Sequence, residues 1–148
     1  MSGRARSIRL PLALSLLLGT VGAYPAQAEI VVVVASNNPV GALTANEVND
    51  LFLGRSNRFP NGQLASPIEQ SEGSNAQLEF YQRILQRTPA QMKAHWSKLV
   101  FTGRGEPPPS VASDSAMIDA LSADPGAVGY VDSSSLDDRV KVVFSLVQ

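Results

Sequence analysis

The sequence predicts an α/β fold, in which a mostly parallel sheet is flanked by helices. Three observations predict it. Ile30 to Ala35 is a continuous apolar run rich in β-branched residues, typical of a strand that is covered on both faces. Segments with strand and helix patterns alternate along the chain after it. The apolar segments 127–131 and 140–147 supply further strands near the end.

The first 28 residues have the pattern of a secretory signal peptide. Three arginines precede the uncharged apolar run 10–23, and small residues lead up to Ala28. The apolar run is shorter than the roughly 20 residues that cross a bilayer, which disfavours the alternative of an uncleaved anchor. We therefore expect cleavage after Ala28, no membrane insertion after cleavage, and a single domain of residues 29–148.

Composition excludes several function classes. The chain has no cysteine, which rules out disulfides and thiol chemistry. Three of its 12 basic residues lie in the leader, which leaves 9 against 13 acidic residues and a net charge of −4. Without a basic stripe we expect no nucleic-acid partner. A small anion remains compatible with this charge, because local backbone dipoles decide such binding.

Capping patterns and apolar spacing predict the helices that flank the sheet. Thr44 with Glu47, and Thr88 with Gln91, form capping boxes at which we expect helices to begin. Gly54 can adopt the left-handed conformation that ends the first of them. We expect short strands at 64–69 and 110–112 and a last helix at 114–123. Apolar residues at helical spacing predict the inner faces: Val48, Leu51, Phe52, Leu78, Tyr81, Ile84, Leu85, Met92, Trp96, Leu99, Val100, Met117, Ile118 and Leu121.

Enzyme chemistry has little support in the sequence. No phosphate-binding loop, nucleophile elbow or paired histidine motif occurs. The lone histidine, His95, lies in a predicted helix, where a packed or surface role is the common one. We therefore expect no catalytic residue, no cofactor and no metal site.

The segment from Glu69 to Asn75 is the candidate binding site. It joins a predicted strand to a helix, and a helix start presents free N–H groups that attract an anion. Gly73 allows close approach to the backbone, and the Ser71 and Ser74 hydroxyls can donate to anion oxygens. The alternative is plain capping of the helix by Ser74 with Gln77.

Several segments together resemble the phosphate-binding proteins of bacterial ABC importers. They run from the first strand into Leu43-Thr44, then through 46–54, 71–74 and 125–131, and cover nearly all of the chain after the leader. The resemblance implies one lobe of a type II periplasmic binding protein, a periplasmic location, and weak binding of phosphate or a related small oxyanion. It also implies a membrane transporter or another periplasmic protein as partner.

The expected ligand-binding residues are Ser71, Gly73, Ser74 and Asn75. Ser36 and Asn37, which follow the first strand, are expected to face the same crevice, because ligands gather at the C-terminal ends of strands.

Two departures from the family pattern weaken the expected phosphate site. Gln70 stands where the family has an arginine, so a bidentate charged partner is missing. Arg104 replaces it only if its Gly/Pro-rich loop folds over the turn; otherwise Arg104 is solvated. The chain also has residues for one lobe only. The alternative function is therefore a protein–protein interaction module with a vestigial pocket, in which self-association can supply a second lobe.

Overall fold

A computed structural model describes Gly3 and residues 29–147. Apart from Gly3, the predicted leader lies outside the described residues. A central four-stranded sheet has the order β2-β5-β1-β6, and β3 pairs with β4 in a second, two-stranded sheet. The strands are β1 (Ile30–Ala35), β2 (Ser66–Pro67), β3 (Glu69–Gln70), β4 (Ser110–Val111), β5 (Ala127–Asp132) and β6 (Val140–Phe144).

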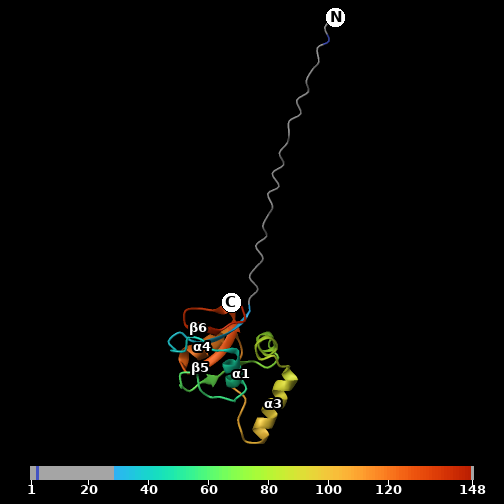
Figure 1. Cartoon of the computed structure of the whole chain (residues 1–148), viewed down its shortest axis with the longest axis vertical. Coiled ribbons are helices and arrows are strands. Elements are labelled where there is room, and N and C mark those ends of the chain that lie inside the picture. The colour runs from blue at the N-terminus through green and yellow to red at the C-terminus, as the bar shows by residue number, and fades with distance from the viewer. Residues whose placement is uncertain (1–2, 4–28, 148) are drawn as a thin grey trace.

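Helices cover both faces of the central sheet, which confirms the predicted α/β class (Figure 1). On one face, α4 packs Met117, Ile118 and Leu121 against the side chains of Val31 and Val33. On the other face, α1, η1 and the start of α3 enclose the larger core. The helical elements are α1 (Ala45–Phe52), α2 (Asn75–Glu79), the π-helix η1 (Phe80–Leu85), α3 (Pro89–Phe101), α4 (Asp114–Ala123) and the 3₁₀ turn η2 (Ser133–Ser135).

The central sheet is mixed, which corrects the expectation that it is mostly parallel. β1 runs antiparallel to both β5 and β6, and the only parallel pairs among the described residues are the short ones, β2 with β5 and β3 with β4. The apolar run of β1 reflects burial on both faces by helices, and that burial is independent of strand direction.

The helix starts and stops agree with the sequence. Thr44 and Thr88 form complete capping boxes with Glu47 and Gln91, and Gly54 adopts a positive φ of 71° after α1. These features depend on neighbours within a few residues, so the local sequence specifies them.

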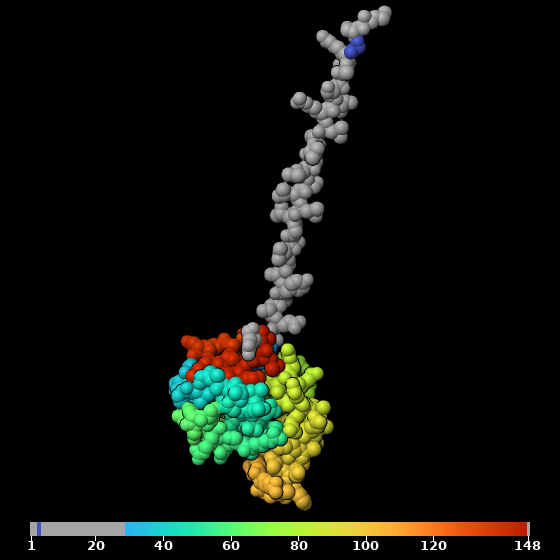
Figure 2. Space-filling view, in the orientation of Figure 1, coloured from blue at the N-terminus to red at the C-terminus, as the bar shows by residue number. Residues whose placement is uncertain are grey.

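Three element expectations were wrong in extent. The expected strand at 64–69 is divided, because β2 joins the central sheet whereas β3 joins the second sheet. The last strand ends at Phe144. The inner faces are incomplete, since Leu78 is exposed and Val100 is 53% exposed. Only the first half of α3 packs on the core, through Met92 and Trp96, and its end and the following loop project from the body (Figures 1 and 2).

Among residues 29–147, no helix is both long and apolar enough to cross a membrane.

Candidate functional site

The predicted strand–turn–helix is present at residues 69–75. β3 ends at Gln70, Gly73 has a φ of +77°, and Ser74 is the N-cap of α2, which continues directly into η1. Ser71 and Ser74 are half-buried, while Gly73 and Asn75 are exposed. The turn therefore presents backbone and hydroxyl groups at the surface.

Several of the predicted donors already have partners within the protein. The Ser71 amide and hydroxyl both donate to the carbonyl of Val111, at 3.0 and 3.2 Å. The Gly73 amide donates to Oε1 of Gln77 at 2.8 Å, and the Ser74 amide donates to the carbonyl of Ser71 at 3.0 Å. The capping interaction that the sequence left as an alternative is thus formed, since Ser74 Oγ accepts the Gln77 amide at 3.2 Å.

The donors left at this turn are fewer than expected. Within the described part of the chain, the amides of Asn75 and Ala76 have no hydrogen-bond acceptor. The Ser74 hydroxyl proton is also free, because its oxygen acts only as an acceptor. Ser74 and Asn75 retain donors for a ligand, whereas Ser71 and Gly73 shape the turn.

Ser36 and Asn37 do not lie at the same edge of the sheet as this turn, which corrects the expectation of a shared crevice. They follow the end of β1, where the Ser36 amide donates to the carbonyl of Arg139. The next residue, Asn38, donates from its side chain to the carbonyl of Pro125, just before β5. Because β1 is antiparallel to β5, its end meets the start of β5, whereas Gln70 contacts Tyr130 near the end of β5. The expectation assumed parallel strands, and the two segments therefore face opposite edges.

Gln70, which stands in the arginine position, is buried in the interior and does not face the turn. The residue is 3% exposed, and its side chain donates to Asp114 Oδ1 at 2.6 Å and to the Tyr130 carbonyl at 3.0 Å. Arg104 is exposed beyond the end of α3. Neither residue supplies the bidentate cation that an oxyanion binds best.

A buried glutamate beside the turn was missed by the sequence analysis. Glu69 is 5% exposed, and its Oε2 accepts from the Tyr130 hydroxyl at 3.0 Å and from Gln77 Nε2 at 3.5 Å. Burial raises the pKa of this carboxyl, and the hydrogen bonds from Tyr130 and Gln77 oppose that rise. The sequence does show a charged residue at the end of a predicted strand, which is the one signal for a buried carboxylate here. It does not show that this residue bonds to Tyr130, because the two positions are 61 residues apart.

The lone histidine has a packing contact. His95 Nε2 lies 2.7 Å from the carbonyl oxygen of Leu53, which ties α3 to the end of α1. In the described part of the chain, no group of three or more His, Cys, Asp and Glu side chains is placed to hold a metal ion.

No known protein family matches this chain by sequence, and no curated protein does. The fold is nevertheless that of part of the phosphate ABC transporter substrate-binding proteins, which confirms the resemblance at the level of the fold. One similar structure is a putative phosphate substrate-binding protein from Clostridium perfringens with bound phosphate, with a TM-score of 0.58 and 19% identity over 78% of this chain.

Two further structures agree with this result. An ABC-type phosphate transport receptor from Vibrio cholerae has a TM-score of 0.54 at 19% identity, over 78% of this chain and 45% of that protein. PstS from Borrelia burgdorferi has a TM-score of 0.61 at 10% identity, over 81% of this chain and 48% of that protein. The match to the Clostridium perfringens protein covers 44% of its length, so the chain spans less than half of each of these structures.

Proposed function

We propose that residues 29–148 form an exported, periplasmic solute-binding-like domain that holds phosphate or a related small oxyanion weakly at the start of α2. One observation carries the proposal. An exposed turn with free donors lies in a fold shared with transport proteins described as phosphate-binding, one of which has phosphate bound. These neighbours are described as an ABC transporter substrate-binding protein and an ABC-type transport receptor, which favours a transporter as partner and a role without catalysis.

The donors that suit this role are the Ser74 hydroxyl and the amides of Asn75 and Ala76. Gly73 keeps the approach open, because no atom of the described residues, apart from its two chain neighbours, lies within 4 Å of the position that a Cβ would occupy there. Ser71 contributes by orienting the turn through its two bonds to Val111. Ser36 and Asn37 are left out of the proposed site because they lie at the other edge of the sheet.

Binding at this turn is expected to be weak for two physical reasons. Among residues 29–147, no arginine or lysine is hydrogen-bonded into the turn, and the exposed Glu72 lies within it. Hydrogen bonds to charged groups contribute roughly 1.5–3 kcal/mol each, so an absent arginine removes a large part of the affinity. The turn is also open to water, which weakens each remaining electrostatic contact.

Removing one backbone donor tests the proposal. Asn75 is the first residue of α2, where proline is tolerated, and Ser74 has the extended backbone (φ −65°, ψ 152°) that precedes a proline. Asn75→Pro should therefore remove the amide and preserve the helix. Ala45→Pro at the start of α1 is the matched control, because Thr44 is also extended there.

Calorimetry with inorganic phosphate at low salt should show weak heat for the wild type and for Ala45→Pro, and clearly less for Asn75→Pro. A folded wild-type protein that gives no heat at millimolar phosphate would contradict the proposal. Equal heats from both proline variants would also contradict it.

A specific observation favours the second candidate, a protein–protein interaction module. Val100 and Phe101 are 53% and 93% exposed at the projecting end of α3 (Figure 2). A photo-crosslinking residue at position 101 should give one discrete product in the periplasm, whereas the same residue at Leu64, which is 60% exposed, should give none. Absence of a product from position 101 would count against this function.

A further inference from the structure

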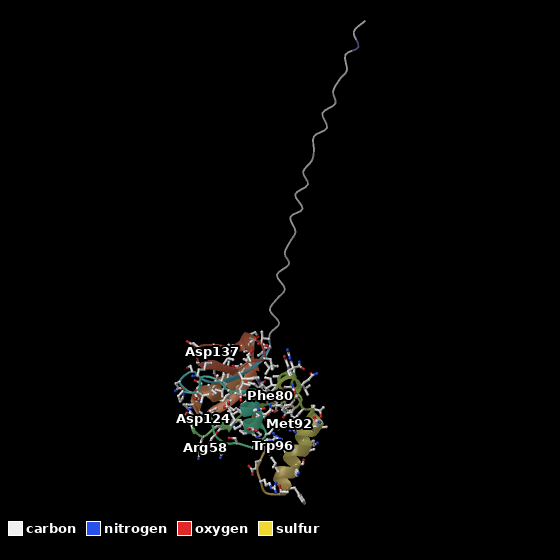
Figure 3. All side chains as sticks on the ribbon, viewed as in Figure 1. Arg58, Phe80, Met92, Trp96, Asp124 and Asp137 are labelled. Atoms are coloured by element: carbon white, nitrogen blue, oxygen red, sulfur yellow. The ribbon has the colours of Figure 1, made fainter. Side chains whose placement is uncertain are left out.

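A pocket of about 630 Å³ lies between α3 and the segment that contains β3, α2 and η1. Its volume is in the range of small-molecule sites. Met92 and Trp96 supply an apolar wall from α3, and Pro107 and Pro108 supply another from the loop before β4. Figure 3 shows Met92 and Trp96 on the side of α3 that faces the body of the protein. Ser71, Ser74 and Asn75 are not part of the wall, so the pocket differs from the proposed oxyanion turn.

The polar end of the pocket contains an acceptor without a partner. Glu69 forms part of the wall, and its Oε1 is buried with no hydrogen-bond partner among the described residues. A buried acceptor that lacks a donor is unfavourable, and native structures contain few of them. A ligand that carries a donor would satisfy this oxygen.

The side chain of Gln77 bonds the other oxygen of this carboxylate. Its Nε2 donates to Glu69 Oε2 and to the Gln70 carbonyl at 3.5 Å in both cases, the longest hydrogen bonds of this cluster. Nε2 also donates to the Tyr81 hydroxyl at 3.1 Å, and none of these bonds reaches Oε1, so this oxygen is left for the donor of a ligand.

The charges of the wall decide between ligand classes. The charged side chains are the carboxylates of Glu69 and Glu72 and the ammonium of Lys93, a net negative set that contains no arginine. An anion would meet the two carboxylates, whereas a cation would pair with Glu69. The apolar wall additionally requires a carbon body, which Trp96 can contact through its ring face.

We propose that this pocket binds a small primary ammonium compound with an apolar or aromatic body. The ammonium group donates to Oε1 of Glu69, and the body lies between Met92 and Trp96 of α3 and the proline-rich loop.

Trp96 is the only tryptophan of the chain, so its fluorescence reports on the pocket directly. The probes are benzylammonium, neutral benzyl alcohol and anionic benzoate, each titrated into the exported protein at neutral pH. Benzylammonium should give a saturable change, benzyl alcohol should bind about tenfold more weakly because it lacks the charge, and benzoate should give none. Equal binding of benzylammonium and benzoate, or no saturable response to benzylammonium, would overturn the proposal.

Substitutions at the polar end and in the wall complete the test. Glu69→Gln should weaken benzylammonium binding about tenfold, whereas Glu106→Gln, at an exposed position outside the wall, should leave it unchanged.

Ser97→Phe fills the pocket from an exposed position of α3 and should abolish binding, and Ala94→Phe on the same helix, outside this pocket, is its control. Circular dichroism verifies that each variant is folded. Unchanged affinity in a folded Glu69→Gln or Ser97→Phe variant would overturn the proposal.

Discussion

The ring of Phe80 stacks on the ring of Tyr130 with a centroid distance of 3.9 Å and an interplanar angle of 11°. Phe52 packs edge-on against Phe80 at 4.8 Å, so Tyr130 is held within an aromatic cluster. The Tyr130 hydroxyl then reaches Oε2 of Glu69 at 3.0 Å and accepts the Gln70 amide at 3.1 Å. This stack connects the centre of the core to the polar end of the pocket.

Removal of the Tyr130 hydroxyl is expected to destabilise the fold. Tyr130→Phe keeps the stack but deprives the buried Gln70 amide of its acceptor and the Glu69 carboxylate of its shortest hydrogen bond. We expect a loss of about 2 kcal/mol or more in the free energy of unfolding, measured in urea. Tyr81→Phe removes only a hydroxyl that accepts from Gln77 at 3.1 Å, so it should cost less. A larger loss for Tyr81→Phe would contradict this account.

The raised pKa of Glu69 predicts how stability depends on pH. Because the folded protein holds this proton more tightly than the unfolded chain, stability should fall as pH rises above the ordinary glutamate value of 4.5. The fall should end once pH passes the folded pKa of Glu69. The pKa values of Tyr81 and Tyr130 are raised, mainly by burial, so both hydroxyls stay neutral in this window.

Glu69→Gln should remove that fall, so the variant gains stability relative to wild type between acidic and neutral pH. Urea unfolding at a series of pH values measures the difference, with Glu106→Gln as the exposed control. Parallel pH profiles for wild type and Glu69→Gln would show that the carboxyl does not titrate differently in the folded state.

Gly129 is required by the close packing of α4 on the sheet. A Cβ at this position would overlap Sδ of Met117, which is fully buried. Gly129→Ala should therefore destabilise the protein by roughly 1–3 kcal/mol. Gly41→Ala is the matched control, because in the described part of the chain no atom beyond its two neighbours lies within 4 Å of the added Cβ. Equal unfolding midpoints for the two variants in urea would contradict this packing argument.

The capping box at Thr88 should contribute measurably to α3. Its hydroxyl accepts the Gln91 amide at 3.1 Å, and the Gln91 side chain accepts the Thr88 amide at 2.9 Å. Thr88→Ala is expected to lower the free energy of unfolding by about 1 kcal/mol, and Thr88→Ser by much less. A loss from Thr88→Ser as large as that from Thr88→Ala would indicate that the hydroxyl is not the stabilising group.

Part of the candidate site was predictable from the sequence, because the turn depends on neighbouring residues. Ser74 caps α2 and Gly73 has a positive φ, as the local pattern predicts. The partners of the donors were less predictable. Ser71 donates to the carbonyl of Val111, which is 40 residues away. This hydrogen bond forms because β3 pairs with β4, which the local sequence does not show.

The sequence by itself determined the helix boundaries at Thr44, Gly54 and Thr88 and the α/β class, because capping, turn formation and apolar periodicity depend on residues a few positions apart. Only the tertiary structure decided that β1 is antiparallel to its neighbours and that Glu69 is buried under Tyr130. The physical reason is that both depend on contacts between segments distant along the chain, and an apolar strand buried on both faces is compatible with either direction of pairing.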